Sequence, residues 1–185
     1  QPKGYEAKTL HSLGLLILKE SPEKVLVNSA FDLLDETEKN RIVKGLCDRW
    51  LAANRTRWRH YLKTSQEDRR YQKDLNLWVN AIRDMIASTI TNIKLQGYSA
   101  AELEDIKTRV LQDENDSFLK WTFEIMDEYD RHIRNLGRVD FDDLIVLAYR
   151  LLLDDSEIRE QLQNRWAYVF EDEAQDSTPL QEKLL

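Results

Sequence analysis

The sequence predicts a mostly helical protein with a few short strands. Of its 185 residues only five are Gly and three are Pro, which indicates few tight turns and few helix breaks. Apolar residues recur at three- and four-residue spacing over most of the chain, the period of an amphipathic helix. Charged residues make up 33% of the chain, as expected for helices with exposed, ion-paired faces.

The first elements follow from local pattern. We expect a short strand over Glu6–Leu10, then an apolar helix that closes near Ser21-Pro22. Residues 25–34 have no clear period. A long helix is expected from Asp35, with an apolar stripe that runs from Val43 through Trp58 and Tyr61 to Leu62.

Capping signals divide the middle of the chain. Ser65 and Asp68 resemble a weak capping box for a helix that ends at Gln96-Gly97-Tyr98, and Ser99 with Glu102 forms a stronger box for the next helix. The turn at residues 113–116 precedes a helix with aromatic residues on its apolar face, which closes near Gly137.

The C-terminal part combines apolar and acidic segments. Asp140 is expected to cap an apolar, buried helix, with Asp142 and Asp143 placed to suit the helix dipole rather than to bind a metal. A helix from 155 or 156 to about 164 follows. Tyr168-Val169-Phe170 favours a short strand, and Ser177-Thr178-Pro179 is typical of a helix start.

Between that strand and that helix lies the acidic run Glu171-Asp172-Glu173, followed by Gln175-Asp176. A strand that delivers adjacent carboxylates can hold Mg²⁺ through water with one and take a proton with the other. The alternative is an ordinary solvated acidic loop, because the whole chain is acidic, with a net charge of −7.

Three ordered motifs resemble those of UvrD/Rep/PcrA-type superfamily 1 DNA helicases. Asp172–Asp176 is similar to the Asp-Glu-x-Gln-Asp Walker B box, Val139–Ile145 to the Asp-Phe-Asp-Asp-Leu stretch upstream of it, and Thr9–Leu13 to the Thr-Phe-His-Ser motif. The last fifty residues match well, the first fifteen moderately, and the middle hardly at all. Glu171 departs from the apolar residue and Ala174 from the aromatic residue common in the family.

The resemblance implies a helical insertion subdomain attached to an incomplete RecA-like α/β part. Residues 1–20 and 137–185 would form edges of the RecA-like part, and 21–136 the insertion. ATP and Mg²⁺ are the implied cofactors of the full-length protein. Asp172 would hold Mg²⁺, Glu173 would act as the base, and Gln175 would sense the γ-phosphate. Thr9, His11 and Ser12 would contact single-stranded DNA, although His11 could equally be a helix-start residue without a ligand.

Residues 49–73 are strongly basic. They hold eight Lys and Arg against two acids, a net +6, which leaves −13 for the rest of the chain. Aromatic rings are interleaved, a composition typical of nucleic-acid surfaces. The predicted contacts are Arg55, Arg57, Trp58, Arg59 and Lys63. The alternative is an amphipathic helix pair with its rings turned inward.

Other site classes find little support. Cys47 is the only cysteine, so an internal disulfide and a Cys-based zinc site are excluded, and His11, His60 and His132 lack ligand spacing. Apolar runs are too short to span a bilayer, and no signal peptide is visible, so we expect a cytoplasmic protein without membrane contacts.

We therefore predict an internal piece of an ATP-dependent 3′–5′ DNA helicase or translocase of repair or replication restart. Its partners would be single-stranded and junction DNA and the other subdomains of the same protein. The chain has no Gly-x-x-x-x-Gly-Lys-Thr/Ser loop, so we expect it to be inactive alone. The alternatives are a non-catalytic helical nucleic-acid-binding or protein-interaction module and a metal-dependent nuclease.

Overall fold

The computed structural model describes residues 6–20, 32–63 and 69–185. This part is mostly helical, and its two strands are short: β1 (Asp32–Leu33) pairs in parallel with β2 (Arg138–Val139). The predicted fold class is confirmed as far as secondary structure is concerned: the described residues are mostly helical with short strands. The chain divides into two compact units, one containing the described residues up to Leu34, Lys94–Tyr98 and Gly137–Leu185, the other Asp35–Ile93 and Ser99–Leu136.

The first unit is built around α7. It contains α1 (Leu10–Glu20), α7 (Phe141–Asp154), α8 (Ser156–Arg165) and α9 (Pro179–Leu184). Gly14 allows α1 to approach α7 closely, because a Cβ there would lie 3.1 Å from the carbonyl oxygen of Leu144. The expected burial of α7 is confirmed, and its apolar face forms the core together with Ile17, Leu18, Ile158, Leu180 and Leu184.

The N-terminus of α7 is closed by a capping box. The Asp140 carboxylate accepts from the backbone N–H of Asp143 at 2.8 Å, and the Asp143 carboxylate accepts from that of Asp140 at 3.3 Å. The predicted cap is therefore confirmed. The acids at this helix start have a structural role.

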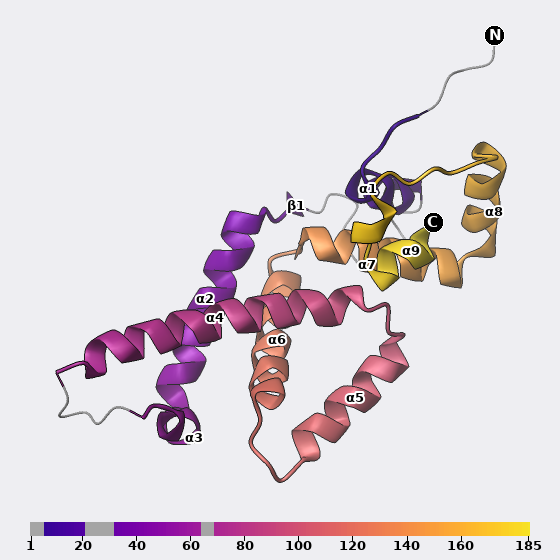
Figure 1. Ribbon diagram of the computed structural model, residues 1–185. Coiled ribbons are helices and arrows are strands. Elements are labelled where there is room, and N and C mark those ends of the chain that lie inside the picture. Colours follow the sequence, from indigo (N-terminus) through magenta and orange to yellow (C-terminus); the bar gives the residue numbers. More distant parts are fainter. Residues whose placement is uncertain (1–5, 21–31, 64–68) are drawn as a thin grey trace. The chain divides into compact units, whose positions relative to one another are not determined.

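The second unit is entirely helical in its described part (Figure 1). Its elements are α2 (Glu36–Ala53), α3 (Arg55–Trp58), a 3₁₀ turn (Arg59–Tyr61), α4 (Tyr71–Leu95, whose last two residues belong to the first unit), α5 (Ala100–Gln112) and α6 (Phe118–Asn135). Local signals set the helix ends. Ser99 and Glu102 form the predicted capping box, and Gly97 after α4 and Gly137 after α6 adopt positive φ.

The predicted continuous helix from Asp35 to Leu62 is wrong. α2 ends at Ala53, where both the backbone N–H and the side-chain amide of Asn54 donate to the carbonyl of Trp50 at 2.9 Å. An Asn side chain that competes for the backbone in this way favours a helix end. The chain then turns into α3 and the 3₁₀ turn, which changes the direction of every side chain after Asn54.

The predicted strands at Glu6–Leu10 and Tyr168–Phe170 are also wrong, since neither segment is a strand in the structure. A strand needs a neighbour that completes its backbone hydrogen bonds, and in the described residues neither segment has one. The side chains of Tyr168 and Phe170 are 82% and 92% exposed. The predicted Ser65–Asp68 capping box lies outside the described residues.

Candidate functional site

The acidic run and the Gln175-Asp176 pair lie in a turn between α8 and α9, residues 171–176, which we call the acidic turn. A 3₁₀ turn spans Ala174–Asp176. α9 then begins at Pro179, with Thr178 as its cap and Gln181 completing a capping box. The predicted helix start after the acidic run is confirmed. The turn is thus joined directly to a helix whose Leu180 and Leu184 are buried in the core of the first unit.

Within this turn, the three predicted catalytic and metal-binding side chains are neighbours. Glu173 has a left-handed backbone, with φ at +56°, which is uncommon for a residue with a side chain. Its N–H donates to the Asp172 carboxylate at 3.1 Å, and the Gln175 side-chain amide donates to the Glu173 carboxylate. All three are exposed, and in the described residues neither carboxylate has a cationic partner. They are free to take a ligand from solvent.

The chemistry of the donors suits Mg²⁺, which prefers carboxylate oxygens and keeps much of its water shell. The described residues contain no group of three or more His, Cys, Asp or Glu arranged as a complete protein cage. Asp172 and Glu173 fit an ion bound mainly by water and substrate oxygens. The other acidic cluster has a different role, because Lys94 Nζ lies 3.0 Å from Asp140 Oδ2 and 2.7 Å from Asp143 Oδ1.

His11 and Ser12 lie in the first turn of α1, and Thr9 directly precedes it. The Thr9 hydroxyl accepts from the Ser12 N–H at 3.2 Å and donates to the Ser12 hydroxyl at 2.9 Å. The His11 ring packs edge-on against Phe141 of α7, with 5.4 Å between ring centroids. Thr9 and Ser12 are exposed and His11 is half-buried. In the described residues no hydrogen bond joins this helix start to the acidic turn.

The predicted DNA-contact residues of the basic segment 49–73 separate into two groups. Arg57 is held internally: its guanidinium contacts Asp116 at 2.6 and 2.8 Å and Glu124 at 2.8 and 3.0 Å, and it lies over the Trp50 ring. The hydrogen bonds to Asp116 are the main reason why the pKa of Arg57 is raised above its ordinary value. Trp58 is 3% exposed, stacks on Trp78 at 4.8 Å and donates to the Leu51 carbonyl.

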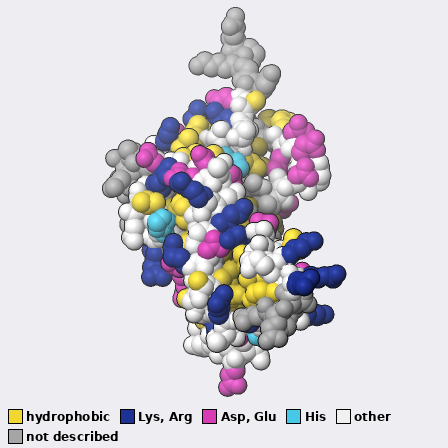
Figure 2. Space-filling model, turned by 90° about the vertical axis from the view of Figure 1, so that its left-hand side faces the viewer, with side chains coloured by type: hydrophobic (Ala, Val, Ile, Leu, Met, Phe, Trp, Pro, Cys, Tyr) yellow, Lys and Arg dark blue, Asp and Glu magenta, His cyan; other side chains and the backbone are white. Residues whose placement is uncertain are grey.

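The second group faces solvent. Arg55 and Lys63 are exposed, and within the described residues neither has a hydrogen-bond or ion-pair partner. Arg59 is half-buried; it lies over the Tyr71 ring and donates to the Leu62 carbonyl at 3.3 Å. Figure 2 looks onto the side of the molecule where α3 and the start of α4 lie in Figure 1. Its lower half shows hydrophobic side chains with Lys and Arg side chains beside them.

Tyr61 is an exposed ring that the sequence analysis did not select. It is 50% exposed, and its ring lies 4.1 Å from that of His60 between centroids. The apolar pattern from Val43 to Leu62 predicts Tyr61 on the buried stripe of one long helix. Asn54 is the sequence signal that could have predicted the exposure of Tyr61. A helix that ends at Asn54 no longer holds the later rings on the buried stripe.

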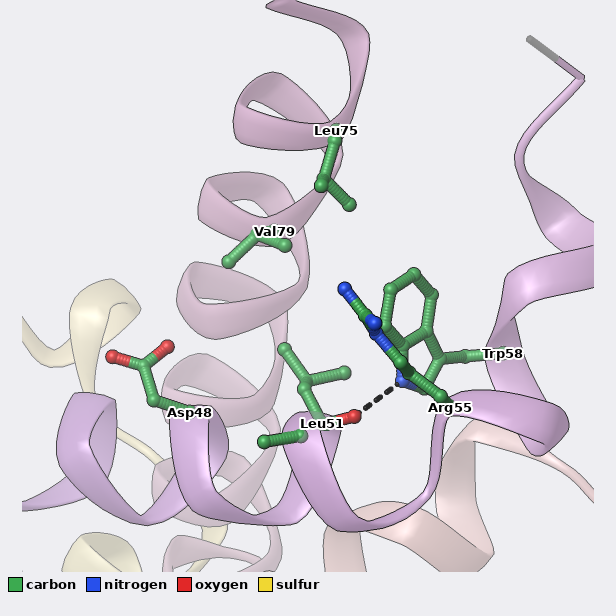
Figure 3. Close-up of a pocket in the computed structure, with 7 residues that line it drawn as sticks. Asp48, Leu51, Arg55, Trp58, Leu75 and Val79 are labelled. Atoms are coloured by element: carbon green, nitrogen blue, oxygen red, sulfur yellow. Dashed lines mark hydrogen bonds between the residues drawn. The ribbon is translucent and has the colours of Figure 1, made fainter. Parts of the chain in front are cut away.

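Arg55 and Trp58 also line a pocket of about 340 Å³ in the second unit (Figure 3). Leu51 and Ala52 of α2 and Leu75 and Val79 of α4 supply its apolar wall, and Asp48 lies at one side. The Asp48 carboxylate accepts from the Arg83 guanidinium. The pocket is therefore apolar inside, with charged side chains around it.

The comparisons with known proteins point in one direction. The UvrD/REP helicase N-terminal domain family matches residues 2–185. The chain is 25% identical over 185 residues to the ATP-dependent DNA helicase Rep of Salmonella typhimurium, covering 100% of the chain and 23% of that protein. It is 24% identical to the Rep helicase of Escherichia coli over the same shares. A putative ATP-dependent DNA helicase, YjcD, of Bacillus subtilis is 31% identical over 70 residues, which are 38% of the chain and 9% of that protein.

The chain spans less than a quarter of the length of the Rep proteins that it matches. Among the described residues, no helix is both long and apolar enough to cross a membrane. Because the family matches almost the whole sequence, the resemblance seen in the three motifs is confirmed. The chain belongs to the UvrD/REP helicase N-terminal domain family.

Proposed function

We propose that the chain is part of an ATP-dependent DNA helicase or translocase that moves 3′–5′ on DNA in repair or replication restart. The observation that carries this proposal is the acidic turn, in which Asp172, Glu173 and Gln175 are adjacent and exposed, in a chain that the helicase family matches from end to end. The similarity to Rep proteins, which are ATP-dependent DNA helicases, supports the activity. Activity belongs to the full-length protein, because the chain covers less than a quarter of those relatives.

In this proposal the acidic turn acts on the γ-phosphate of ATP. Asp172 would hold Mg²⁺ through the water shell of the ion, which when bound would supply charge neutralisation at the phosphates. Glu173 orients the attacking water and accepts its proton. The Gln175 amide donates to the Glu173 carboxylate, which supports its proposed roles of orienting the base and sensing the γ-phosphate.

We also propose that residues 1–20 and 137–185 belong to a RecA-like subdomain and that 21–136 form a helical insertion. The division into two compact units supports this, with two refinements: the described residues 32–34 and Lys94–Tyr98 group with the first unit. The chain contains no Gly-x-x-x-x-Gly-Lys-Thr/Ser loop to hold phosphates, so we propose that it neither hydrolyses ATP nor unwinds DNA by itself.

The proposed DNA contacts in the basic segment 49–73 are the exposed residues Arg55, Tyr61 and Lys63 and the half-buried Arg59. Arg55, Arg59 and Lys63 neutralise phosphates, and Tyr61 supplies a ring on which a base can stack. Arg57 and Trp58 hold the helices that present these residues, since both are committed to internal contacts. Thr9, His11 and Ser12 are proposed to contact single-stranded DNA at the start of α1, where hydroxyl and N–H groups can reach a phosphate.

The test replaces the proposed base in the full-length protein. Glu173→Gln keeps the size of the side chain and removes its proton acceptor, so we expect the ATPase rate to fall by about 10²–10⁴-fold while nucleotide binding persists. Glu171→Gln is the matched control, because Glu171 lies two residues away and its carboxylate accepts from the Ser177 hydroxyl. An equal loss in both variants, or none in Glu173→Gln, would contradict the assigned base.

A further inference from the structure

The segment Lys94–Tyr98, at the end of α4, is fastened to the first unit at two points. The first is the buried ion cluster of Lys94 with Asp140 and Asp143, in which the side chains of Lys94 and Asp140 are 6% and 0% exposed. Separating such a buried pair is costly, because it leaves a buried charge without its partner. The C-terminal end of α4 is therefore held at the capped N-terminus of α7.

The second point is Gly97, which lies against α9. Its φ is +73°, and its carbonyl accepts from Lys183 Nζ at 2.9 Å. A Cβ on Gly97 would lie 3.2 Å from Lys183 Cδ and Nζ and 3.4 Å from Leu180 Cα. A Cβ on Gly97 would therefore make the end of the Lys183 side chain, which donates to the Gly97 carbonyl, shift by a few tenths of an ångström, and at positive φ it would also strain the backbone.

α9 is also the helix that closes the acidic turn. Its cap, Thr178, comes two residues after Asp176, and the N–H groups of Asp176 and Ser177 donate within the turn, to Glu173 and Ala174. A movement of α9 away from Gly97 would therefore change the turn that carries Glu173 and Gln175. α4 itself begins at Tyr71, within the basic segment 49–73, and ends at Leu95, two residues before Gly97.

We propose that Gly97 and Lys183 are positioning residues, which couple the end of α4 to the geometry of the acidic turn through α9. A DNA-induced change in α4 is then transmitted to the side chains that act on ATP. This inference rests on the proposed function for its activity readout. The contact between Gly97 and α9 lies outside both the acidic turn and the basic segment 49–73.

The structure offers a matched pair of glycines for the test. Both Gly97 and Gly137 have positive φ after a helix, but a Cβ on Gly137 would meet nothing within 4 Å. Gly97→Ala and Gly137→Ala therefore impose similar backbone strain, and only the first disturbs the contact with α9. In the full-length protein we expect Gly97→Ala to lower the ratio of DNA-stimulated to basal ATP hydrolysis severalfold with DNA affinity unchanged, and Gly137→Ala to keep that ratio.

A lysine series provides the second variant set. Lys183→Met should lower the stimulation in the same way, and Lys183→Arg, which retains a donor, should restore it. Lys19→Met, at an exposed lysine of α1 without a partner among the described residues, is the control for loss of a charge. Full stimulation in both Gly97→Ala and Lys183→Met would overturn the proposal.

Hydrogen exchange separates this proposal from the proposed function. The amides of Asp176 and Ser177 should exchange faster in Gly97→Ala than in Gly137→Ala, because the hydrogen bond from Lys183 that ties α9 to Gly97 is weakened. If the wild type shows no DNA-stimulated hydrolysis, the proposed function fails, and the exchange rates still decide whether Gly97 positions the turn. Equal exchange in the two alanine variants would overturn the positioning role.

Discussion

Arg55 and Arg57 are two residues apart and carry the same charge, but the structure gives them different surroundings. Arg57 makes paired hydrogen bonds to two carboxylates, and Arg55 points away from any such partner in the described residues. Sequence composition cannot separate them, because it gives the charge of each residue but not that Asp116, in the turn before α6, and Glu124 of α6 lie beside Arg57. The same holds for Trp58 and Tyr61, of which only Tyr61 is exposed.

The difference between the two arginines predicts different effects on stability. Arg57→Met should lower the free energy of unfolding by about 1–3 kcal/mol, because Asp116 and Glu124 lose charged hydrogen bonds in a partly buried site. Arg55→Met should change it by no more than about 0.5 kcal/mol. Urea unfolding of the chain measures both. Equal effects in the two variants would show that Arg57 is no more structural than Arg55.

The pH dependence of stability should report the same contact. The hydrogen bond from Arg57 is the main reason why the pKa of Asp116 lies below its ordinary value. A carboxyl with a lowered folded-state pKa stabilises the protein above its unfolded value, about 3.9, and this stabilisation is lost as pH falls through the folded value. Stability should therefore decrease on acidification below about pH 4 more steeply in wild type than in Arg57→Met, as followed by thermal unfolding from pH 6 to pH 2. Parallel curves would exclude this linkage.

At the scale of elements, local sequence signals predict most helix ends correctly, whereas the two strands predicted from local sequence are absent from the structure. The capping boxes at Ser99 and Asp140 and the ends at Gly97 and Gly137 are encoded by residues within one turn of the boundary, so the sequence locates them. The strand at Tyr168–Phe170 depends on a neighbouring strand far away in sequence, and the described residues provide none. β-propensity alone could not reveal this, since it describes a fit to a sheet that must already be present.

The basic segment gives a prediction at the same scale. A variant carrying Arg55→Glu and Lys63→Glu should bind single-stranded DNA more weakly than wild type. Its plot of log K against log salt should be shallower by about 1.4, because about 0.7 is lost per phosphate contact. Fluorescence anisotropy across a salt series, with a single strand and with a junction, measures this.

The control for that titration reverses two exposed arginines outside the segment, Arg134→Glu and Arg150→Glu. It has the same change in net charge, so a local contact predicts little change in the salt slope. Equal losses in the two variants would mean that only overall charge matters. Binding as tight as wild type by the variant with Arg55→Glu and Lys63→Glu would show that these two residues do not contact DNA.

At the scale of the whole molecule, the family could be recognised from three short motifs, while the middle of the chain offered almost no match to it. The family nevertheless matches residues 2–185, which includes that middle part. The reason is physical: the acidic turn and the helix starts need particular side chains, whereas a helical unit needs only apolar residues at the right period. The two compact units are each consistent with this division.

The central claim is that the chain is part of a DNA-dependent ATP-hydrolysing motor. The most direct measurement is steady-state ATP hydrolysis by the full-length protein, with Mg²⁺, in the presence and absence of single-stranded DNA. Our account predicts hydrolysis that DNA stimulates and that Glu173→Gln abolishes. Absence of ATP hydrolysis with and without DNA would contradict it. A hydrolysis rate that changes neither on addition of DNA nor in Glu173→Gln would contradict it as well.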